Sequence, residues 1–141
     1  MNPKERATKV TDQMYKEDWF SQWLGIERLG EDEGSAKLRL TIRKDMLNGF
    51  GIAHGGITYS LADSAFAFAC NSHGRKSVSV ETSISHLKPL KEGDVITATA
   101  VEESLSNKIS VYRIEITNKA GEKVALFKGT AYRTSKEWET D

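Results

Sequence analysis

Apolar and polar residues alternate along several short stretches of this chain, which is the pattern of half-buried β-strands. The clearest example is residues 35–43, SAKLRLTIR, in which every second side chain is apolar. Turn sequences separate these stretches, and short connections favour antiparallel neighbours because a parallel return needs a crossover of a dozen or more residues. Four later stretches share the strand pattern: 77–87, 95–102, 109–117 and 123–132.

Two other stretches have helical periodicity. Residues 11–24 place Tyr15, Trp19 and Trp23 at helical spacing, and Gly25 follows as a C-terminal stop, so we expect a short helix that packs by its aromatic face. Residues 55–71 are apolar nearly all round, and a helix of that kind must be covered on most sides. We therefore expect the sheet to curl round this helix and a second subunit to cover the rest.

One long helix and a curved antiparallel sheet predict an α+β fold. The length of 141 residues suits a single domain spanning 1–141, with one core. Within it, residues 1–24 are expected to form an N-terminal arm with the short helix. The polar residues 134–141 are expected to be a frayed tail.

Composition and charge narrow the classes of partner. Twenty Lys and Arg balance twenty Asp and Glu, so no global basic field gathers nucleic acid or an anionic membrane, and any anion must be held locally. A single cysteine, Cys70, excludes an intrachain disulfide and fits a reducing compartment. The start lacks the apolar core of a signal peptide, so we expect a cytoplasmic protein. None of the three histidines has zinc-site spacing, and no metal is expected.

A glycine-rich segment, NGFGIAHGG, leads directly into the apolar helix. It is neither a dinucleotide fingerprint nor a P-loop, because the glycine spacing differs and the Lys-Ser/Thr pair is missing. Gly55 and Gly56 lie at the helix N-terminus, where free N–H groups and the helix dipole favour negative charge. They are therefore candidates for binding a ligand oxygen, and the alternative is that they only form a tight turn.

Asp63 is a second candidate, since a carboxylate in the middle of an apolar helix costs free energy unless it is paired or functional. The alternative is a structural role in which Ser60 or another strand bonds it. Gly56 and Asp63 share one helix face but lie about 10 Å apart along the axis. If a backbone N–H near Gly55 holds a carbonyl that Asp63 attacks, the two groups must come from different subunits of a two-fold dimer.

His54 can hydrogen-bond a ligand, orient the loop or act as an acid or base, although a lone histidine beside a helix start is more often a loop residue. Tyr59, Phe66, Phe68 and Phe50 can line an acyl pocket or belong to the core. The residues alone leave both alternatives open.

The segment LNGFGIAHGGITYSLADSAFAFACN resembles the hotdog-fold acyl-CoA thioesterases, most closely the PaaI-like branch of the phenylacetate pathway. SISHLKPLKEGDVITATA and VALFKGTAYR resemble other strands of that family. The resemblance covers nearly the whole chain. It implies a curved antiparallel sheet wrapped round one long central helix, and a homodimer with active sites at its interface that pairs further into a homotetramer.

The resemblance also implies roles for individual residues. The N–H at Gly55 polarises the thioester carbonyl, and Asp63 of the other subunit attacks it or activates water. Asn48 lies near the thioester, His54 positions groups, and Ser83 matches a threonine that helps place the attacking water. The implied substrate is an aromatic, phenylacetyl-type, or short to medium-chain acyl-CoA, which contributes coenzyme A, so no separate cofactor is expected. Five further residues are expected to bind substrate: Gly56, Tyr59, Phe66, Lys88 and Arg75.

Lys88 and Arg75, with Lys76 and Lys91, flank the third strand of that family and are candidates for the coenzyme A phosphates, although a charged loop is usually only solvated. Two other functions stay open at this point. One is a hydroxyacyl-thioester dehydratase, which the helical Ala62-Asp63 pair disfavours. The other is a non-catalytic acyl-CoA sensor or binding module.

Overall fold

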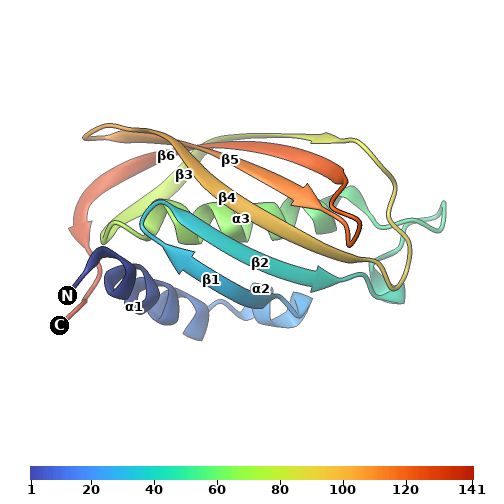
Figure 1. Cartoon of the computed structure of the whole chain (residues 1–141), viewed down its shortest axis with the longest axis horizontal. Coiled ribbons are helices and arrows are strands. Elements are labelled where there is room, and N and C mark those ends of the chain that lie inside the picture. Colours follow the sequence, from blue (N-terminus) through green and yellow to red (C-terminus); the bar gives the residue numbers. More distant parts are fainter.

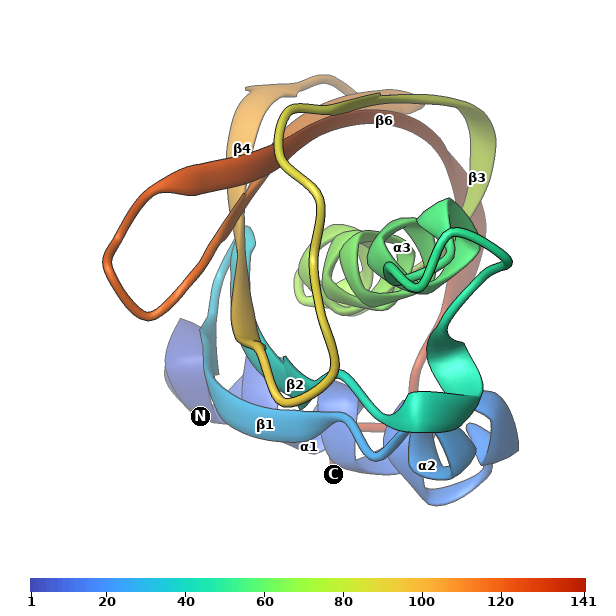
Figure 2. The ribbon, with the colours of Figure 1, turned by 90° about the vertical axis from the view of Figure 1, so that its right-hand side faces the viewer.

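The structure, a computed structural model, describes residues 1–141. A six-stranded antiparallel sheet in the order β1-β2-β4-β5-β6-β3 curves round one long helix (Figures 1 and 2). This confirms the α+β hotdog fold. The strands are β1 (Glu27–Asp32), β2 (Ser35–Thr41), β3 (Arg75–His86), β4 (Val95–Leu105), β5 (Ile109–Thr117) and β6 (Lys123–Glu137). The helices are α1 (Pro3–Lys16), α2 (Trp19–Leu24), α3 (Gly55–Asn71) and the short 3₁₀ helix η1 (Lys44–Met46).

The central helix α3 fills the concave side of the sheet, as the view along its axis shows (Figure 2). Phe66 is buried there against the rings of Tyr112 and Phe127, at centroid distances of 5.8 and 5.9 Å. Gly129 on β6 lets the helix come this close, because a Cβ at that position would lie 2.7 Å from the Phe66 ring. The core is therefore closed by the contact between α3 and the middle of the sheet.

One face of α3 is less covered than the others. Gly56 is exposed, and Ser60, Asp63 and Ala67, which follow at helical spacing, are only half-buried. Most apolar residues on the remaining faces are buried, and Ile57 and Tyr59 are partly buried. The sheet thus curls round the helix as expected, and its wrap leaves the face that carries Asp63 partly open.

The N-terminal arm differs from the sequence-based expectation. A single helix was predicted over 11–24, but α1 ends at Lys16 and Asp18 starts α2 by accepting the Ser21 N–H at 3.0 Å. Because α2 buries Ser21 and Leu24, its opposite side turns outward and leaves Trp19 and Trp23 70% and 64% exposed. The expectation that this segment packs by its aromatic face is therefore confirmed for Tyr15, which contacts the Phe68 ring, and is wrong for the two indoles within the protomer.

The C-terminal tail is more ordered than predicted. Strand β6 continues to Glu137, which pairs with Arg75 of β3, instead of ending near residue 132. The Trp138 indole N–H then donates to Asn71 Oδ1 at 2.9 Å. The frayed tail expected for 134–141 is thus wrong for 134–138, because β3 supplies a ladder partner that composition does not reveal.

Strand β3 forms one edge of the sheet and bonds only to β6. Its other edge is unpaired over twelve residues, and Val78 and Val80 are exposed on it. A long edge with apolar side chains is a template for pairing with another chain.

No helix of the structure is long and apolar enough to cross a membrane.

Candidate functional site

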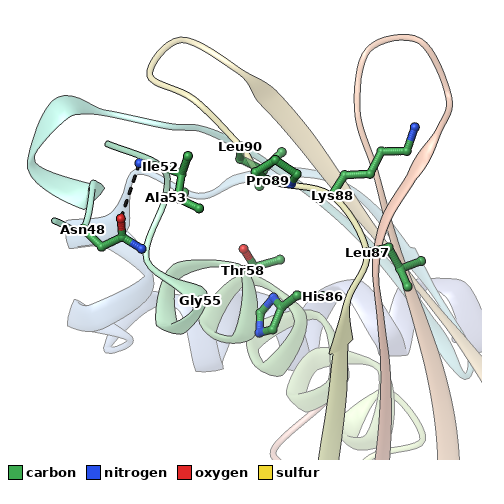
Figure 3. Close-up of a pocket in the computed structure, with 10 residues that line it drawn as sticks. All are labelled: Asn48, Ile52, Ala53, Gly55, Thr58, His86, Leu87, Lys88, Pro89 and Leu90. Atoms are coloured by element: carbon green, nitrogen blue, oxygen red, sulfur yellow. Dashed lines mark hydrogen bonds between the residues drawn. The ribbon is translucent and has the colours of Figure 1, made fainter. Parts of the chain in front are cut away.

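The loop before α3 is held by Asn48. Its Oδ1 accepts the N–H groups of Phe50 and Ile52 at 2.9 and 3.4 Å, and its own N–H donates to the Ile52 carbonyl. Gly51 turns the loop at φ 79°, a conformation that other residues rarely adopt. With Oδ1 engaged in this way, the side-chain NH₂ of Asn48 is turned toward the start of the helix (Figure 3).

His54 caps the N-terminus of α3. Its Nδ1 accepts the Gly56 N–H at 3.0 Å, so the ring proton of a neutral His54 is on Nε2. No acceptor in the protomer takes the N–H of Gly55, the first residue of the helix. The structure therefore leaves a free backbone donor at Gly55, where the helix dipole favours a negative oxygen.

A cavity of about 340 Å³ opens beside Gly55, and we call it the Gly55 cavity (Figure 3). The buried Thr58 lines it with a hydroxyl that has no hydrogen-bond partner in the protomer. Its lining contains no carboxylate. The lining residues are Asn48, Ile52, Ala53, Gly55, Thr58, His86, Leu87, Lys88, Pro89 and Leu90.

His86 is a site residue whose position the sequence reasoning missed. Its imidazole lies so close to Gly55 that a Cβ there would be 3.1 Å from Nε2. Gly55 has ordinary helical φ, so the constraint on a side chain here is the contact with His86, which would have to shift by a few tenths of an ångström. The alternation of β3 contained the signal, because His86 shares a strand face with Ile84, which packs against the core.

A second cavity of about 320 Å³ lies between α2 and the N-terminal turn of α3, and we call it the aromatic cavity. Gly56, His54 and Ser60 line one side of it. Phe20 and Trp23 of α2 line the other. The remaining lining residues are Asp45, Met46, Leu47 and Ile57.

Asp63 is half-buried on the open face of α3 and has no hydrogen-bond or ion-pair partner in the protomer. Burial raises the pKa of its carboxyl, and the negative charge of Asp18 adds to this effect. Asp63 lies eight positions after Gly55 on the same continuous helix, which is about 12 Å along the axis. The two groups therefore do not meet within one protomer.

Two aromatic residues on α3 were predicted to bind substrate. The Tyr59 hydroxyl is 2.6 Å from Thr82 Oγ1 of β3, and its ring is half-buried against Phe127. Phe66 is only 1% exposed and lines neither cavity. Phe66 is therefore a core residue and not part of an acyl pocket, because β6 approaches α3 very closely at Gly129.

The remaining predicted residues lie apart from one another. Ser83 follows Thr82, whose hydroxyl faces α3, so Ser83 is on the opposite face of β3, beside a cavity that Lys128 also lines. Arg75 is at the far end of β3 from His86 and donates to the Thr134 carbonyl. Of the cations predicted to bind substrate, only Lys88 lines the Gly55 cavity, and it forms an ion pair with Glu122 that lowers the pKa of that carboxyl.

No three His, Cys, Asp or Glu side chains come together in an arrangement that could hold a metal ion. Cys70 is buried in the core, which raises the pKa of its thiol to about 12. The Cys70 thiol lines neither of the two cavities.

Comparison with known proteins places the site in context. Residues 50–125 match the family described as the Thioesterase superfamily. The chain is 43% identical over 128 residues to the acyl-coenzyme A thioesterase PaaI of Escherichia coli K12, covering 91% of each protein. It resembles the structure of the E. coli PaaI protein from the phenylacetic acid degradation operon with a TM-score of 0.94 and 39% identity, covering 96% of this chain and 99% of that one.

A more distant structure is also similar. It is a hypothetical thioesterase from Streptococcus pneumoniae TIGR4 solved with coenzyme A. Its TM-score is 0.77 at 26% identity, and the match covers 80% of this chain and 88% of that one. The matched family segment begins at Phe50, so the family profile contains α3 and the Gly55 turn but not α2.

Proposed function

This chain belongs to the thioesterase superfamily, and on that premise we propose that it hydrolyses acyl-CoA thioesters at a site shared by two subunits. One observation carries the proposal: α3 presents a free N–H at Gly55 and, about 12 Å further along the same helix, an unpaired carboxylate at Asp63. A thioesterase needs both an oxyanion donor and an attacking or activating group at the reacting carbon. The spacing requires that the second group come from another copy of the chain.

In this mechanism the thioester oxygen accepts the Gly55 N–H while the helix dipole favours its developing negative charge. Asp63 of the partner subunit either attacks the carbonyl carbon or removes a proton from the attacking water. On the first route the C–S bond breaks as the thiolate leaves, and water then hydrolyses the mixed anhydride to the free acid, which restores the Asp63 carboxylate while a proton of that water goes to the thiolate. On the second route the water oxygen bonds to the carbonyl carbon, the C–S bond breaks, and the proton held by Asp63 passes to the departing thiolate. Asn48 directs its NH₂ group toward the same turn, and His54 holds the turn by capping Gly56. These steps need only the protein, the substrate and water.

The second subunit is expected to pair through the β3 edge. Two antiparallel β3 strands related by a two-fold axis would continue the sheet and bury Val78 and Val80. The same axis would bring the open faces of the two α3 helices near each other. We propose that two such dimers form the homotetramer. An aromatic acyl group of the phenylacetyl type is the substrate that the similarity to PaaI supports.

The test is Asp63→Asn assayed by release of free thiol from phenylacetyl-CoA. General acid–base groups contribute about 10²- to 10⁴-fold, so kcat should fall by at least about 100-fold. The fold should persist, because a carboxyl whose pKa is raised in the folded state is most stabilising below its unfolded pKa and loses that contribution as pH rises. At neutral pH the neutral amide of the variant therefore avoids the free-energy cost of burying a charged carboxylate.

Asp12→Asn is the control, since Asp12 is an exposed carboxylate on α1 that pairs with Arg28. It should keep wild-type turnover. Near wild-type hydrolysis of every acyl-CoA by the Asp63→Asn protein would contradict the proposed function.

A further inference from the structure

Two cavities of similar size flank the Gly55-Gly56 turn, and their linings differ in chemistry. A thioester also has two different arms, an acyl group and a long polar pantetheine arm, which leave the carbonyl in different directions. If the carbonyl oxygen sits at the Gly55 N–H, each arm needs its own cavity. The chemistry of each lining determines which arm of the thioester that cavity can bind.

The Gly55 cavity presents polar groups without protein partners. They include the Thr58 hydroxyl, the Gly55 N–H and the NH₂ group of Asn48. A ligand with hydrogen-bonding groups can pair with them, whereas a ligand that covers them without pairing costs free energy. The amide-containing arm provides such groups, and an apolar acyl group does not.

The aromatic cavity differs because most of its polar groups are already bonded within the protein. Ser60 Oγ donates to the Gly56 carbonyl at 2.7 Å, and Gly56 N–H donates to His54. Asp45 pairs with the Arg43 guanidinium at 3.2 Å. A ligand entering here therefore meets mainly apolar surface.

Two rings of α2 form the wall of this cavity. Phe20 and Trp23 are one turn apart with ring centroids 6.0 Å from each other, and they stay 52% and 64% exposed. The Arg43 guanidinium lies 5.8 Å from the Trp23 ring and donates to the Leu24 carbonyl at 2.7 Å, which supports the indole at the cavity edge. Exposed aromatic rings that are held in place provide a flat surface on which another ring can stack.

We infer that the aromatic cavity binds the acyl group of the substrate, and that Trp23 and Phe20 select aromatic acyl groups. This inference rests on the proposed function. It assigns specificity to α2, a helix outside the residues that match the family profile.

The test compares kcat/KM for phenylacetyl-CoA and acetyl-CoA in three variants. Trp23→Ala should lower the phenylacetyl to acetyl ratio by about 10-fold or more, mainly through KM. Trp23→Phe should restore most of the ratio because it keeps a ring. Trp19→Ala is the matched control, since Trp19 is an equally exposed indole on α2 that does not line the cavity, and its ratio should equal that of the wild type.

An unchanged ratio in Trp23→Ala, or an equal loss on both substrates, would overturn the inference. Light scattering measures whether the Trp23→Ala variant changes its oligomeric state. If it does, and the ratio is unchanged, the two rings form a contact between copies of the chain and the inference is again wrong.

A binding measurement separates this inference from the proposed function. The double variant Trp19→Phe/Trp138→Phe leaves Trp23 as the single tryptophan of the chain. A non-hydrolysable thioether analogue of phenylacetyl-CoA should change the fluorescence of Trp23 in this variant, whereas the acetyl analogue should not. A response without any turnover by the wild-type protein would refute the proposed hydrolysis alone. Turnover without a response would refute the acyl-group assignment alone.

Discussion

At the scale of single residues, the proposed chemistry depends on the environment of one carboxylate, that of Asp63. Asp63 is half-buried without a hydrogen-bond donor, and Asp18 of the N-terminal arm raises the pKa of its carboxyl further. Asp18 itself is held at the start of α2 by the N–H and hydroxyl of Ser21. The Ser21 hydroxyl is in turn 2.8 Å from that of Ser64, which follows Asp63 on α3. A residue outside the central motif thus sets the charge environment of Asp63.

Asp18→Asn should therefore shift the pH dependence of the reaction. Removing the nearby charge lowers the pKa of Asp63, so the acidic limb of the kcat/KM profile should move to lower pH. Asparagine is a good N-cap, which keeps α2 in place. Glu92→Gln, in the exposed loop between β3 and β4, is the control and should leave the limb where it is. An Asp18→Asn profile that overlays the wild type would show that Asp18 does not influence Asp63.

At the scale of elements, the position of α3 depends on its contact with β6. Phe66 and Gly129 meet where the sheet is closest to the helix, and the neighbouring Phe127 and Tyr112 rings leave Phe66 little freedom to move. This contact sets the distance between helix and sheet.

Gly129→Ala tests this contact. The added methyl would lie 2.7 Å from a buried ring, and overpacking of a tight core costs typically about 1–3 kcal/mol in the free energy of unfolding. Urea denaturation at one fixed protein concentration measures the loss. Gly49→Ala is the control, because it has ordinary φ and no atom within 4 Å of the new methyl, so little change is expected. Equal stability of the two variants would contradict the packing argument.

At the scale of the whole molecule, the site needs two copies of the chain. Asp63→Ala removes one half of each proposed site, and Gly55→Val is chosen to block the other, because its side chain would crowd His86 and enter the Gly55 cavity. A mixed dimer keeps one complete site, with Gly55 from one chain and Asp63 from the other. In a randomly mixed population half of the dimers are mixed, so activity should return to about a quarter of the wild-type value.

Native mass spectrometry confirms that mixed dimers have formed in this experiment. A mixture of Asp63→Ala and Asp63→Asn chains serves as the control and should stay inactive. Mixed Asp63→Ala and Gly55→Val dimers without any recovered activity would place the whole reaction inside one protomer.

The sequence anticipated much of this fold and part of the site. The apolar helix over 55–71 and the strand patterns match α3 and five of the strands closely, because side-chain periodicity reports directly which face of an element is buried. The axial separation of Gly55 and Asp63 also followed from the sequence, since helical rise is constant. The predictions were wrong where contacts with residues distant in the sequence determine the structure, as for the outward-facing indoles of α2 and the extension of β6.

The amino-acid order by itself thus determined most of the elements, the buried face of α3 and of five strands, and the closeness of Asn48, His54 and Gly55 at the start of α3, because these depend on contacts within a few residues. Only the tertiary structure decided that His86 lies against Gly55, that Ser83 and Arg75 lie apart from both cavities, and that Phe20 and Trp23 form the wall of the aromatic cavity. The physical reason is that curvature of the sheet and the packing of α2 arise from contacts between segments far apart in the chain, which a local pattern does not encode.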